Sequence, residues 1–506
     1  MKSSSRKFTL FLLVCLLFGQ ATVLVAKETA DKRPNILFIY TDDHSHRTVS
    51  CYDEAFPWVK TPTIDRLAKE GVRFEYAYIG TWCMPSRATL LTGHHQFAVE
   101  SMRMVGDYPG SDYDHEKCPF WPRVFRKNGY QTAQIGKWHT GVDTGYGRDW
   151  DYQIVWNRPK HTKNHQAYYY GQPVTFQGGE TKTLKRYSTD QYTDWAIDYL
   201  EGEGRDENKP WYLWVCYGAV HSPFTPADRH MDNYPDISIP QPKDIFPPRP
   251  GKPEWMQSVK FWEKGKNNVG MWKGRTLTSW VRQYHQSVVA IDENINRLLK
   301  TLDKTGQREN TLIIFTSDQG HAWGQHGFRQ KVAAYDATIR SPMIVSFPKG
   351  GVAQGKVCPH PVGGVDIVPT IFSFAGIERP WEMHGHDLTP LLKNPTAKWP
   401  HTMMLTATGR KYGSDTHKIP TGKDVFHGAV PWYVMIRKGR YKYVRPMIHD
   451  LEEVYDMKAD PNELNNLAVK PDFQSTLKEL RAEALKELRR TKAGFVGNLP
   501  KVREGA

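Results

Sequence analysis

The chain has few cysteines and no long hydrophobic run beyond its first thirty residues. Six cysteines in 506 residues exclude a small disulfide-stapled scaffold, and the length allows one large hydrophobic core with a smaller one beside it. No later segment offers the roughly 20 consecutive apolar residues of a transmembrane helix, so we expect no stable membrane insertion. The sequence also lacks zinc-finger spacing, a dense Lys/Arg tract and a long-period repeat, and it therefore indicates neither a nucleic-acid-binding module nor a repeat array.

The N-terminal residues follow the order basic, apolar, small. Lys2, Arg6 and Lys7 precede the apolar run 8–19, and alanines follow it. This order is typical of a secretory signal peptide, so we expect residues 1–26 to be removed and the protein to be exported. The destination is the periplasm or the exterior in a bacterium, and the secretory pathway otherwise.

The charge of the chain is strongly positive. It has 68 Lys and Arg against 54 Asp and Glu, a formal net charge of +14. A basic surface attracts nucleic acids, anionic membranes and sulfated glycans alike. Export and the many aromatic residues favour a sulfated carbohydrate partner, and we expect no nucleic-acid partner.

Buried strands alternate with amphipathic helices along most of the sequence. Residues 35–40 and 311–315 are continuous apolar runs, typical of strands buried on both faces. Thr61 is placed as the N-cap of a helix that Gly71 ends, and residues 284–302 carry apolar side chains at helical spacing. This alternation predicts an α/β fold in which helices sandwich a central sheet.

The pattern changes in the last quarter of the chain. We expect a catalytic domain at 32–395 and a smaller α+β domain at 396–506, built on a short antiparallel sheet. Strand-like runs at 432–436 and 440–444 precede a charged amphipathic helix at about 473–490.

Acidic side chains follow two of the predicted strands. Asp42 and Asp43 come after the first, and Asp318 and Gln319 come after the strand near 315. Ligands bind beyond the carboxyl ends of strands in such folds, so we expect these residues to meet. Three carboxylates without a cation would repel one another, and their oxygens suit Ca²⁺, with Mg²⁺ as the alternative. Taken alone, an Asp-Asp pair is more often a turn or helix cap.

The segment around Cys83 carries the strongest motif. Five cysteines remain after the signal peptide, so at least one is unpaired. Residues 83–87, Cys-Met-Pro-Ser-Arg, are followed by Leu-Thr-Gly at 91–93. This pattern resembles the signature of type I, formylglycine-dependent sulfatases, with Met84 and His94 as small departures. Further segments match the family in order, at 34–43, 61–74, 136–139, 221–223 and 316–320.

The resemblance, which extends from about residue 33 to 470, implies an alkaline phosphatase-like fold with a mixed, mostly parallel sheet. It implies that a formylglycine-generating maturation enzyme oxidises Cys83, whose hydrated aldehyde becomes the nucleophile. It also implies one Ca²⁺ held by Asp42, Asp43, Asp318, Gln319 and the modified residue 83. Gln319 stands where asparagine or histidine is frequent and keeps an oxygen donor.

The remaining roles also come from the resemblance. Arg87, one helical turn after the nucleophile, would orient its hydroxyls and the metal ligands. Lys137 and Lys331 would neutralise the sulfate oxygens. His139 would take a proton from the sulfated-enzyme intermediate, and His221 would protonate the leaving alcohol.

These patterns predict an exported sulfatase that cleaves sulfate esters on a carbohydrate or polysaccharide. Two alternatives stay open: a phosphonate or phosphate ester hydrolase of the same superfamily, and a non-catalytic protein that binds sulfated glycans. The aromatic and basic stretch 156–170 would either stack on sugar rings or form a surface loop. No pattern specifies an oligomeric state.

Overall fold

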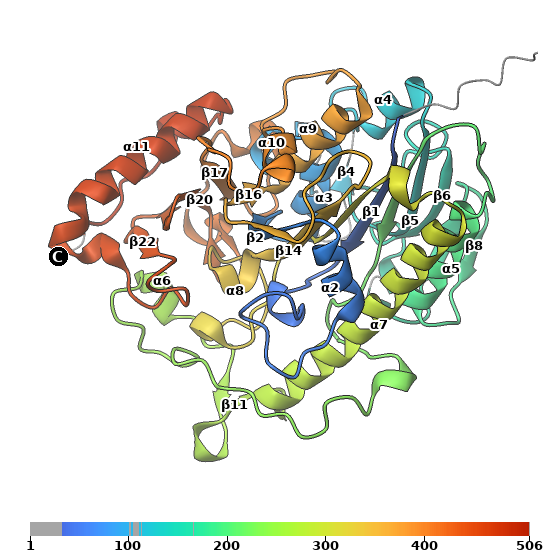
Figure 1. Cartoon of the computed structure of the whole chain (residues 1–506). Coiled ribbons are helices and arrows are strands. Elements are labelled where there is room, and N and C mark those ends of the chain that lie inside the picture. Colours follow the sequence, from blue (N-terminus) through green and yellow to red (C-terminus); the bar gives the residue numbers. More distant parts are fainter. Residues whose placement is uncertain (1–32, 101–102, 105–110, 113, 165, 505–506) are drawn as a thin grey trace, which may run out of the picture.

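The computed structural model describes residues 33–504, except 101–102, 105–110, 113 and 165 (Figure 1). The predicted signal peptide lies outside the described residues. Within the described part of the chain, no helix combines the length and the apolar character that crossing a membrane requires.

A mixed sheet of eleven strands forms the centre of the molecule (Figure 1). The order is β15-β2-β14-β13-β1-β9-β5-β6-β7-β8, and β16 pairs with β2. The central strands from β13 to β6 are parallel, whereas β14 and β7 run against the others, so the mostly parallel sheet is confirmed. The strands are β1 (Asn35–Thr41), β2 (Val72–Tyr78), β5 (Gln131–Trp138), β6 (Tyr152–Asn157), β7 (Pro173–Phe176), β8 (Thr181–Thr183), β9 (Trp211–Cys216), β13 (Thr311–Ser317), β14 (Ser341–Ser346), β15 (Lys356–Cys358) and β16 (Val362–Gly363).

Helices cover both faces of this sheet, as the sequence predicts. Along β1, Ile36, Phe38 and Tyr40 enter one hydrophobic core, and Leu37 and Ile39 enter the other, which is the two-residue period of a doubly covered strand. The first core is closed by α3 (Cys83–Thr92), α4 (Pro122–Lys127), α9 (Gly364–Ala375) and α10 (Thr389–Lys393). The second is closed by α2 (Pro62–Lys69), α5 (Ser188–Leu200) and α7 (Leu277–Lys304).

The N-terminus of α2 differs from the predicted capping. Thr61 precedes the helix, but its side chain makes no cap hydrogen bond. The carboxylate of Asp292 on α7 instead accepts hydrogen bonds from the backbone N–H groups of Thr63 and Ile64, at 3.0 and 2.9 Å. The C-cap is Glu70, one residue before the expected glycine. A tertiary contact therefore supplies the cap.

A smaller antiparallel sheet, of order β17-β20-β21-β22, lies beside the central one. On β17, Met403 and Leu405 enter the first core, while Met404 packs in a third core under α11. The predicted α+β region is thus present, and its boundary at residue 395 stays a prediction. Its elements are β17 (Met403–Ala407), β20 (Tyr433–Lys438), β21 (Tyr441–Pro446), β22 (Glu453–Asp456) and α11 (Gln474–Arg490).

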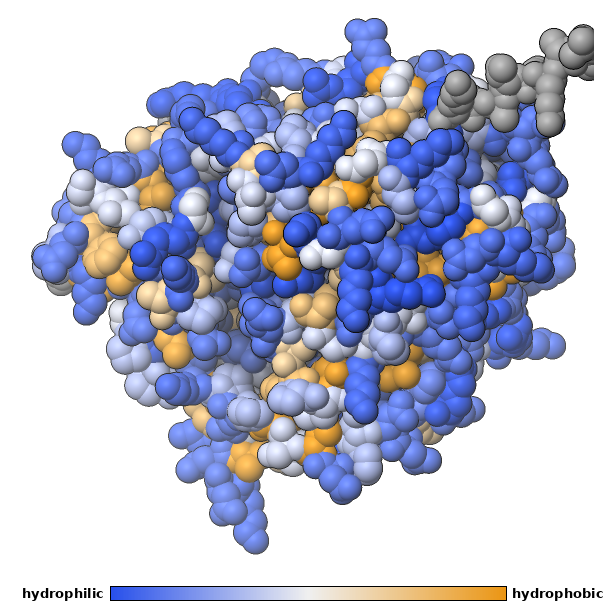
Figure 2. All heavy atoms as spheres, viewed as in Figure 1, coloured by the Kyte–Doolittle hydropathy of each residue, from blue (hydrophilic) through white to orange (hydrophobic). Residues whose placement is uncertain are grey.

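Several short elements lie outside the two sheets. Strands β10, β11 and β12, which precede α7 in the sequence, form a separate small sheet, and β18 and β19 form a two-stranded sheet. The short elements are β3 (Arg103–Met104), β4 (Ser111–Asp112), β10 (Glu263–Lys264), β11 (Gly270–Trp272), β12 (Arg275–Thr276), β18 (Phe426–His427), β19 (Val430–Pro431), α6 (Glu254–Gln257) and α8 (Asp336–Ile339). Figure 2 shows hydrophilic residues over most of one face of the molecule, with small scattered hydrophobic patches.

Candidate active site

The two acidic segments meet at the carboxyl ends of adjacent strands. β1 and β13 are parallel, with Thr41 opposite Ser317, so the residues that follow them are neighbours. The backbone N–H of Asp43 donates to Oδ1 of Asp318 at 2.8 Å. The expectation that the acidic residues meet in space is therefore confirmed.

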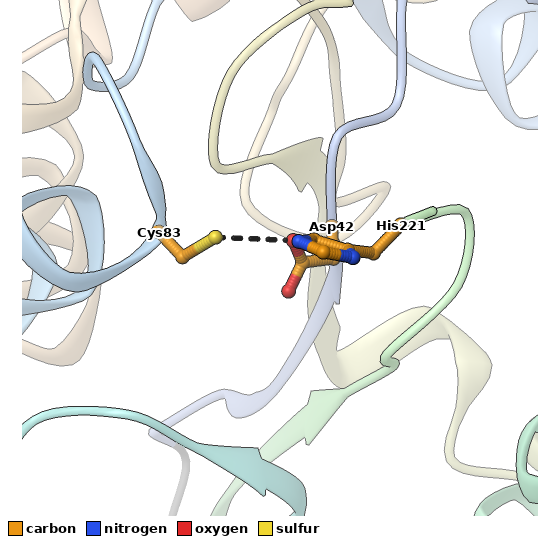
Figure 3. Close-up of side chains that lie close together, drawn as sticks. All are labelled: Asp42, Cys83 and His221. Atoms are coloured by element: carbon orange, nitrogen blue, oxygen red, sulfur yellow. Dashed lines mark hydrogen bonds between the residues drawn. The ribbon is translucent and has the colours of Figure 1, made fainter. Parts of the chain in front are cut away.

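Cys83 is the first residue of α3, which points its N-terminus at this cluster. Its sulfur lies 3.3 Å from Oδ1 of Asp42 (Figure 3) and 3.1 Å from Nζ of Lys331. One ligand atom each from Asp42, Asp43, Cys83 and Asp318 lies within 4.8 Å of all the others. Cys83 carries a free thiol and forms no disulfide.

The thiol of Cys83 is not activated as it stands. Burial, with the negative charge of Asp42, raises its pKa to about 12, although Lys137 and Lys331 oppose the shift. The thiolate is the nucleophilic form of cysteine, so at neutral pH this residue is a weak nucleophile. Residue 83 therefore lies at the centre of the site, but an unmodified cysteine is a weak nucleophile in this position.

Arg87 and Lys137 hold Asp42 from the opposite side. Arg87 lies one turn along α3, and its guanidinium reaches Oδ2 of Asp42 at 3.3 Å and the backbone carbonyl of Lys137 at 3.1 Å. The Lys137 ammonium on β5 forms an ion pair with the same carboxylate. All three side chains are buried, so the charges are neutralised within the cluster rather than by water.

The residues present fit a divalent cation. Oδ2 of Asp318 is buried and has no hydrogen-bond partner among the described residues. Burial, with the charges of Asp42 and Asp43, raises the pKa of Asp318 to about 7. A cation would satisfy the orphaned oxygen and offset the repulsion, and an all-oxygen carboxylate set suits Ca²⁺ or Mg²⁺.

Gln319 is placed at the cluster with its amide turned away from ligation. Its side-chain nitrogen donates to Oδ1 of Asp43, and its carbonyl oxygen lies 3.5 Å from the hydroxyl of Ser86. Half a turn of the amide would exchange the two atoms. Ligation by the Gln319 oxygen therefore stays a prediction that requires this rotation.

His221 directs one ring nitrogen at the cluster. Its Nε2 lies 3.7 Å from Oδ2 of Asp43, and its Nδ1 faces the carbonyl oxygen of Ser222 at 2.7 Å. That contact holds a proton on Nδ1 and leaves Nε2 as the nitrogen that gains or loses one. The ring stacks on Tyr168 with centroids 3.8 Å apart. Burial lowers the pKa of His221 to about 3, with Asp43 opposing.

His139 and Lys331 complete the predicted set. His139 follows β5 and lies beside Trp82, the residue before Cys83, with ring centroids 6.3 Å apart. Burial, reinforced by the charge of Arg158, lowers the pKa of His139 well below its usual value, so the imidazole is neutral. Nη1 of Arg158 lies 3.3 Å from Nδ1 and 3.4 Å from Nε2 of this ring. Nζ of Lys331 lies 2.6 Å from Oδ1 of Asp43.

The loop that carries Lys331 is attached to the smaller sheet. The hydroxyl of Tyr433 on β20 donates to the carbonyl of Val332 at 2.6 Å, and the hydroxyl of Tyr335 donates to Glu453 on β22 at 2.7 Å. Both contacts are buried. The C-terminal region therefore positions one of the basic groups of the site.

The sequence did not indicate two further residues of this region. His321 lies 3.9 Å from Oδ2 of Asp43, and its position two residues after Gln319 could have indicated it. His427, whose ring stacks on Trp82 with centroids 4.8 Å apart, is distant in sequence and carries no local signal. Tyr168 belongs to the aromatic stretch 156–170, but its contact with His221 was not predicted.

Three of the four Trp and Tyr side chains in the stretch predicted to stack on sugars are buried. Trp156, Tyr168 and Tyr169 are each at most 3% exposed, whereas Tyr170 is 40% exposed. The three buried rings are therefore excluded as an open platform for a sugar ring, and Tyr168 stacks on His221 instead.

Comparison with known proteins shows which family this chain belongs to. A family model described as Sulfatase matches residues 34–377. The chain belongs to the sulfatase family. It is accordingly a sulfuric ester hydrolase, and the resemblance found in the sequence is confirmed. A second model, described as N-sulphoglucosamine sulphohydrolase, C-terminal, matches residues 324–491.

Individual relatives of this sulfatase span nearly its whole length. An N-acetylglucosamine-6-O-sulfatase of Bacteroides thetaiotaomicron is 31% identical over 505 residues, covering 89% of this chain and 85% of the relative. An ulvan-active sulfatase of Formosa agariphila is 29% identical, covering 92% and 83%. A solved structure of a protein in complex with its substrate D-glucosamine-2-N,6-O-disulfate superposes with a TM-score of 0.75 and 28% identity, covering 91% of this chain and 98% of that one.

Proposed function

We propose that this sulfatase is exported and removes sulfate from a sulfated carbohydrate, using formylglycine formed from Cys83 and one Ca²⁺. The observation that carries the proposal is the position of Cys83, at the start of α3 and within hydrogen-bond distance of Asp42 and Lys331. The high pKa of the buried thiol favours a modified residue as the nucleophile. Similarity to an N-acetylglucosamine-6-O-sulfatase and an ulvan-active sulfatase supports a carbohydrate substrate.

The side chains of the cluster suit the chemistry of a sulfate ester. The ester presents anionic oxygens, and Lys137 and Lys331 supply positive charge on two sides of residue 83. A bound cation, held by Asp42, Asp43 and Asp318, would add positive charge at the same place.

Proton transfer is assigned to the two histidines. Nε2 of His221 is the nitrogen that would hold a proton for the departing alcohol, because Nδ1 is committed to Ser222. The sulfate anion would raise the low pKa of His221 by favouring the imidazolium. Neutral His139 would accept the proton that restores residue 83, and Arg87 would keep Asp42 in place.

Peptide mass spectrometry tests the nucleophile. In protein purified from its native host, we expect the tryptic peptide 74–87 to be about 18 Da lighter than its unmodified sequence, the change from thiol to aldehyde. The intact mass reports removal of residues 1–26 in the same preparation. Cys83→Ala is the control and should abolish turnover while leaving the melting temperature nearly unchanged.

The outcomes separate the three candidate functions. Full activity with an unmodified thiol would contradict the formylglycine mechanism. Parallel assays on aryl sulfate, aryl phosphate and a phosphonate ester, with and without chelator, identify the ester class, and a strong preference for phosphorus would sink the sulfatase assignment. Binding of sulfated glycans without any turnover would favour a non-catalytic protein.

A further inference from the structure

A pocket with aromatic walls opens beside the acidic cluster. Its inner end is formed by Asp43, His221 and Lys331, which are residues of the proposed active site. Five aromatic side chains also line it, namely Phe224, Trp262, Trp272, Trp280 and Trp323, together with Ser222, His321, Ala322, Arg329 and Gln330.

The aromatic wall is continuous from the cluster outward. The ring of Phe224 lies 5.2 Å from that of His321 and 5.7 Å from that of Trp280, both edge to face. Trp280, in the first turn of α7, lies 4.5 Å from Trp272 of β11 and donates its indole N–H to the carbonyl of Trp272 at 3.2 Å. The wall thus ends on the small sheet β10–β12, where β11 lies at the lower edge of Figure 1.

Arg329 lies at the outer end of this wall. Its guanidinium carbon is 3.9 Å from the ring centroid of Trp272 and 5.6 Å from that of Phe261. Stacking occupies the faces of the planar guanidinium and leaves its N–H donors along the edge. Those donors are arranged to hold a sulfate or carboxylate through two hydrogen bonds.

Within the part of the chain that the structure describes, no acidic side chain forms an ion pair with Arg329. Among the described residues, no carboxylate oxygen lies within 4.0 Å of its guanidinium, and its buried Nε has no hydrogen-bond partner. Lys331, two residues later in the same pocket, is paired with Asp43 at 2.6 Å. A half-buried cation without a counter-charge is costly, and a ligand with an anionic group would supply one.

We propose that Arg329 binds a second anionic group of the substrate, on the same sugar as the cleaved sulfate or on its neighbour, in the pocket that Trp272 and Trp280 help to line. This inference rests on the proposed function and makes it narrower. The preferred substrate then carries two oxyanions, the ester at the acidic cluster and a sulfate or carboxylate at Arg329. Aromatic rings and guanidinium together recognise an amphipathic, multiply charged sugar.

Kinetic comparison of substrates tests the role of Arg329. Matured full-length protein and its Arg329→Gln variant are assayed on an aryl sulfate, a monosulfated sugar, the same sugar with a second sulfate, and a disaccharide that adds a uronic carboxylate. We expect R329Q to lower kcat/KM for one of the doubly charged substrates, relative to the monosulfated sugar, by about 10- to 100-fold, the range of a charge-assisted hydrogen bond. Arg329→Lys should retain part of this preference.

The control variant and the comparison between substrates decide how each result is interpreted. Arg66→Gln, at a side chain on α2 that is 41% exposed and does not line the pocket, should leave the ratio unchanged. The arm with the larger loss tells whether sulfate or carboxylate occupies the Arg329 site. An equal loss on every substrate, or none, would overturn the proposal for Arg329 and leave the sulfatase function intact.

Isothermal titration calorimetry, which measures affinity without turnover, distinguishes failure of the proposed function from failure of the proposed role of Arg329. If the matured protein hydrolyses no sulfate ester, the proposed function fails. Titration of wild type and R329Q with the disulfated sugar and the carboxylate disaccharide then decides the role of Arg329. Tighter binding of either by wild type supports the role, and equal affinities for both refute it.

Discussion

At the scale of single residues, Asp42 organises the site. Its carboxylate receives Arg87, the Lys137 ammonium and the thiol of Cys83. Burial acts to raise its pKa, but the positive charges of Lys137, Lys331 and Arg87 hold the pKa of Asp42 well below its usual value. Asp42 therefore stays ionised without water, and the basic residues around it are fixed by that charge.

The bridging role of Arg87 leads to a prediction. Lysine at this position cannot reach Asp42 and the Lys137 carbonyl together, because its ammonium lacks the fork of the guanidinium. We expect Arg87→Lys to lower kcat/KM on aryl sulfate by about 10- to 100-fold. Steady-state kinetics test this, with Arg66→Lys as the exposed control, and an R87K enzyme of unchanged activity would contradict it.

At the scale of elements, the junction of α2 and α7 supports a prediction about stability. Asp292 accepts two backbone N–H groups at the N-terminus of α2. We expect Asp292→Ala to lower the free energy of unfolding by about 1–2 kcal/mol, the usual effect of losing a helix cap. Urea denaturation measures this loss. Asp292→Asn keeps one acceptor oxygen and should lose less, so equal losses would argue against capping.

The spacing of apolar residues within single helices and strands explains which elements could be predicted from the sequence. The strands at 35–40 and 311–315 and the helix at 284–302 were predicted because their patterns are local. The meeting of the acidic segments followed from the rule that parallel strand ends share an edge. The cap from Asp292, the stack of Tyr168 on His221 and the aromatic pocket depend on contacts between distant segments, which no local pattern encodes.

At the scale of the whole molecule, the protonation of the acidic cluster is linked to stability, and a cation bound there would be linked to both. Burial and the neighbouring charges raise the folded-state pKa of Asp318 to about 7, above its unfolded value of about 3.9. In metal-free protein, its contribution to stability is complete below about pH 4 and is lost as the pH rises to about 7. Ionised Asp318 is also the form that binds a cation.

This linkage predicts how calcium stabilises the protein at different pH values. We expect Ca²⁺ to raise the melting temperature of EDTA-treated protein by a few degrees, and more at about pH 8 than at about pH 6. Thermal denaturation in both buffers tests the prediction. Asp318→Asn should remove the difference, and a calcium effect that does not depend on pH would contradict it.

The attachment of the Lys331 loop to the C-terminal sheet has a consequence for how such an enzyme can change. The loop that brings both Lys331 and Arg329 to the pocket is held by hydrogen bonds to Tyr433 and Glu453, which belong to the C-terminal sheet. An altered residue on β20 or β22 can therefore shift a charge at the reaction centre while lying in another layer of the molecule. The hydrogen bonds that stabilise the packing of the C-terminal sheet against this loop are therefore the same ones that fix the position of Lys331.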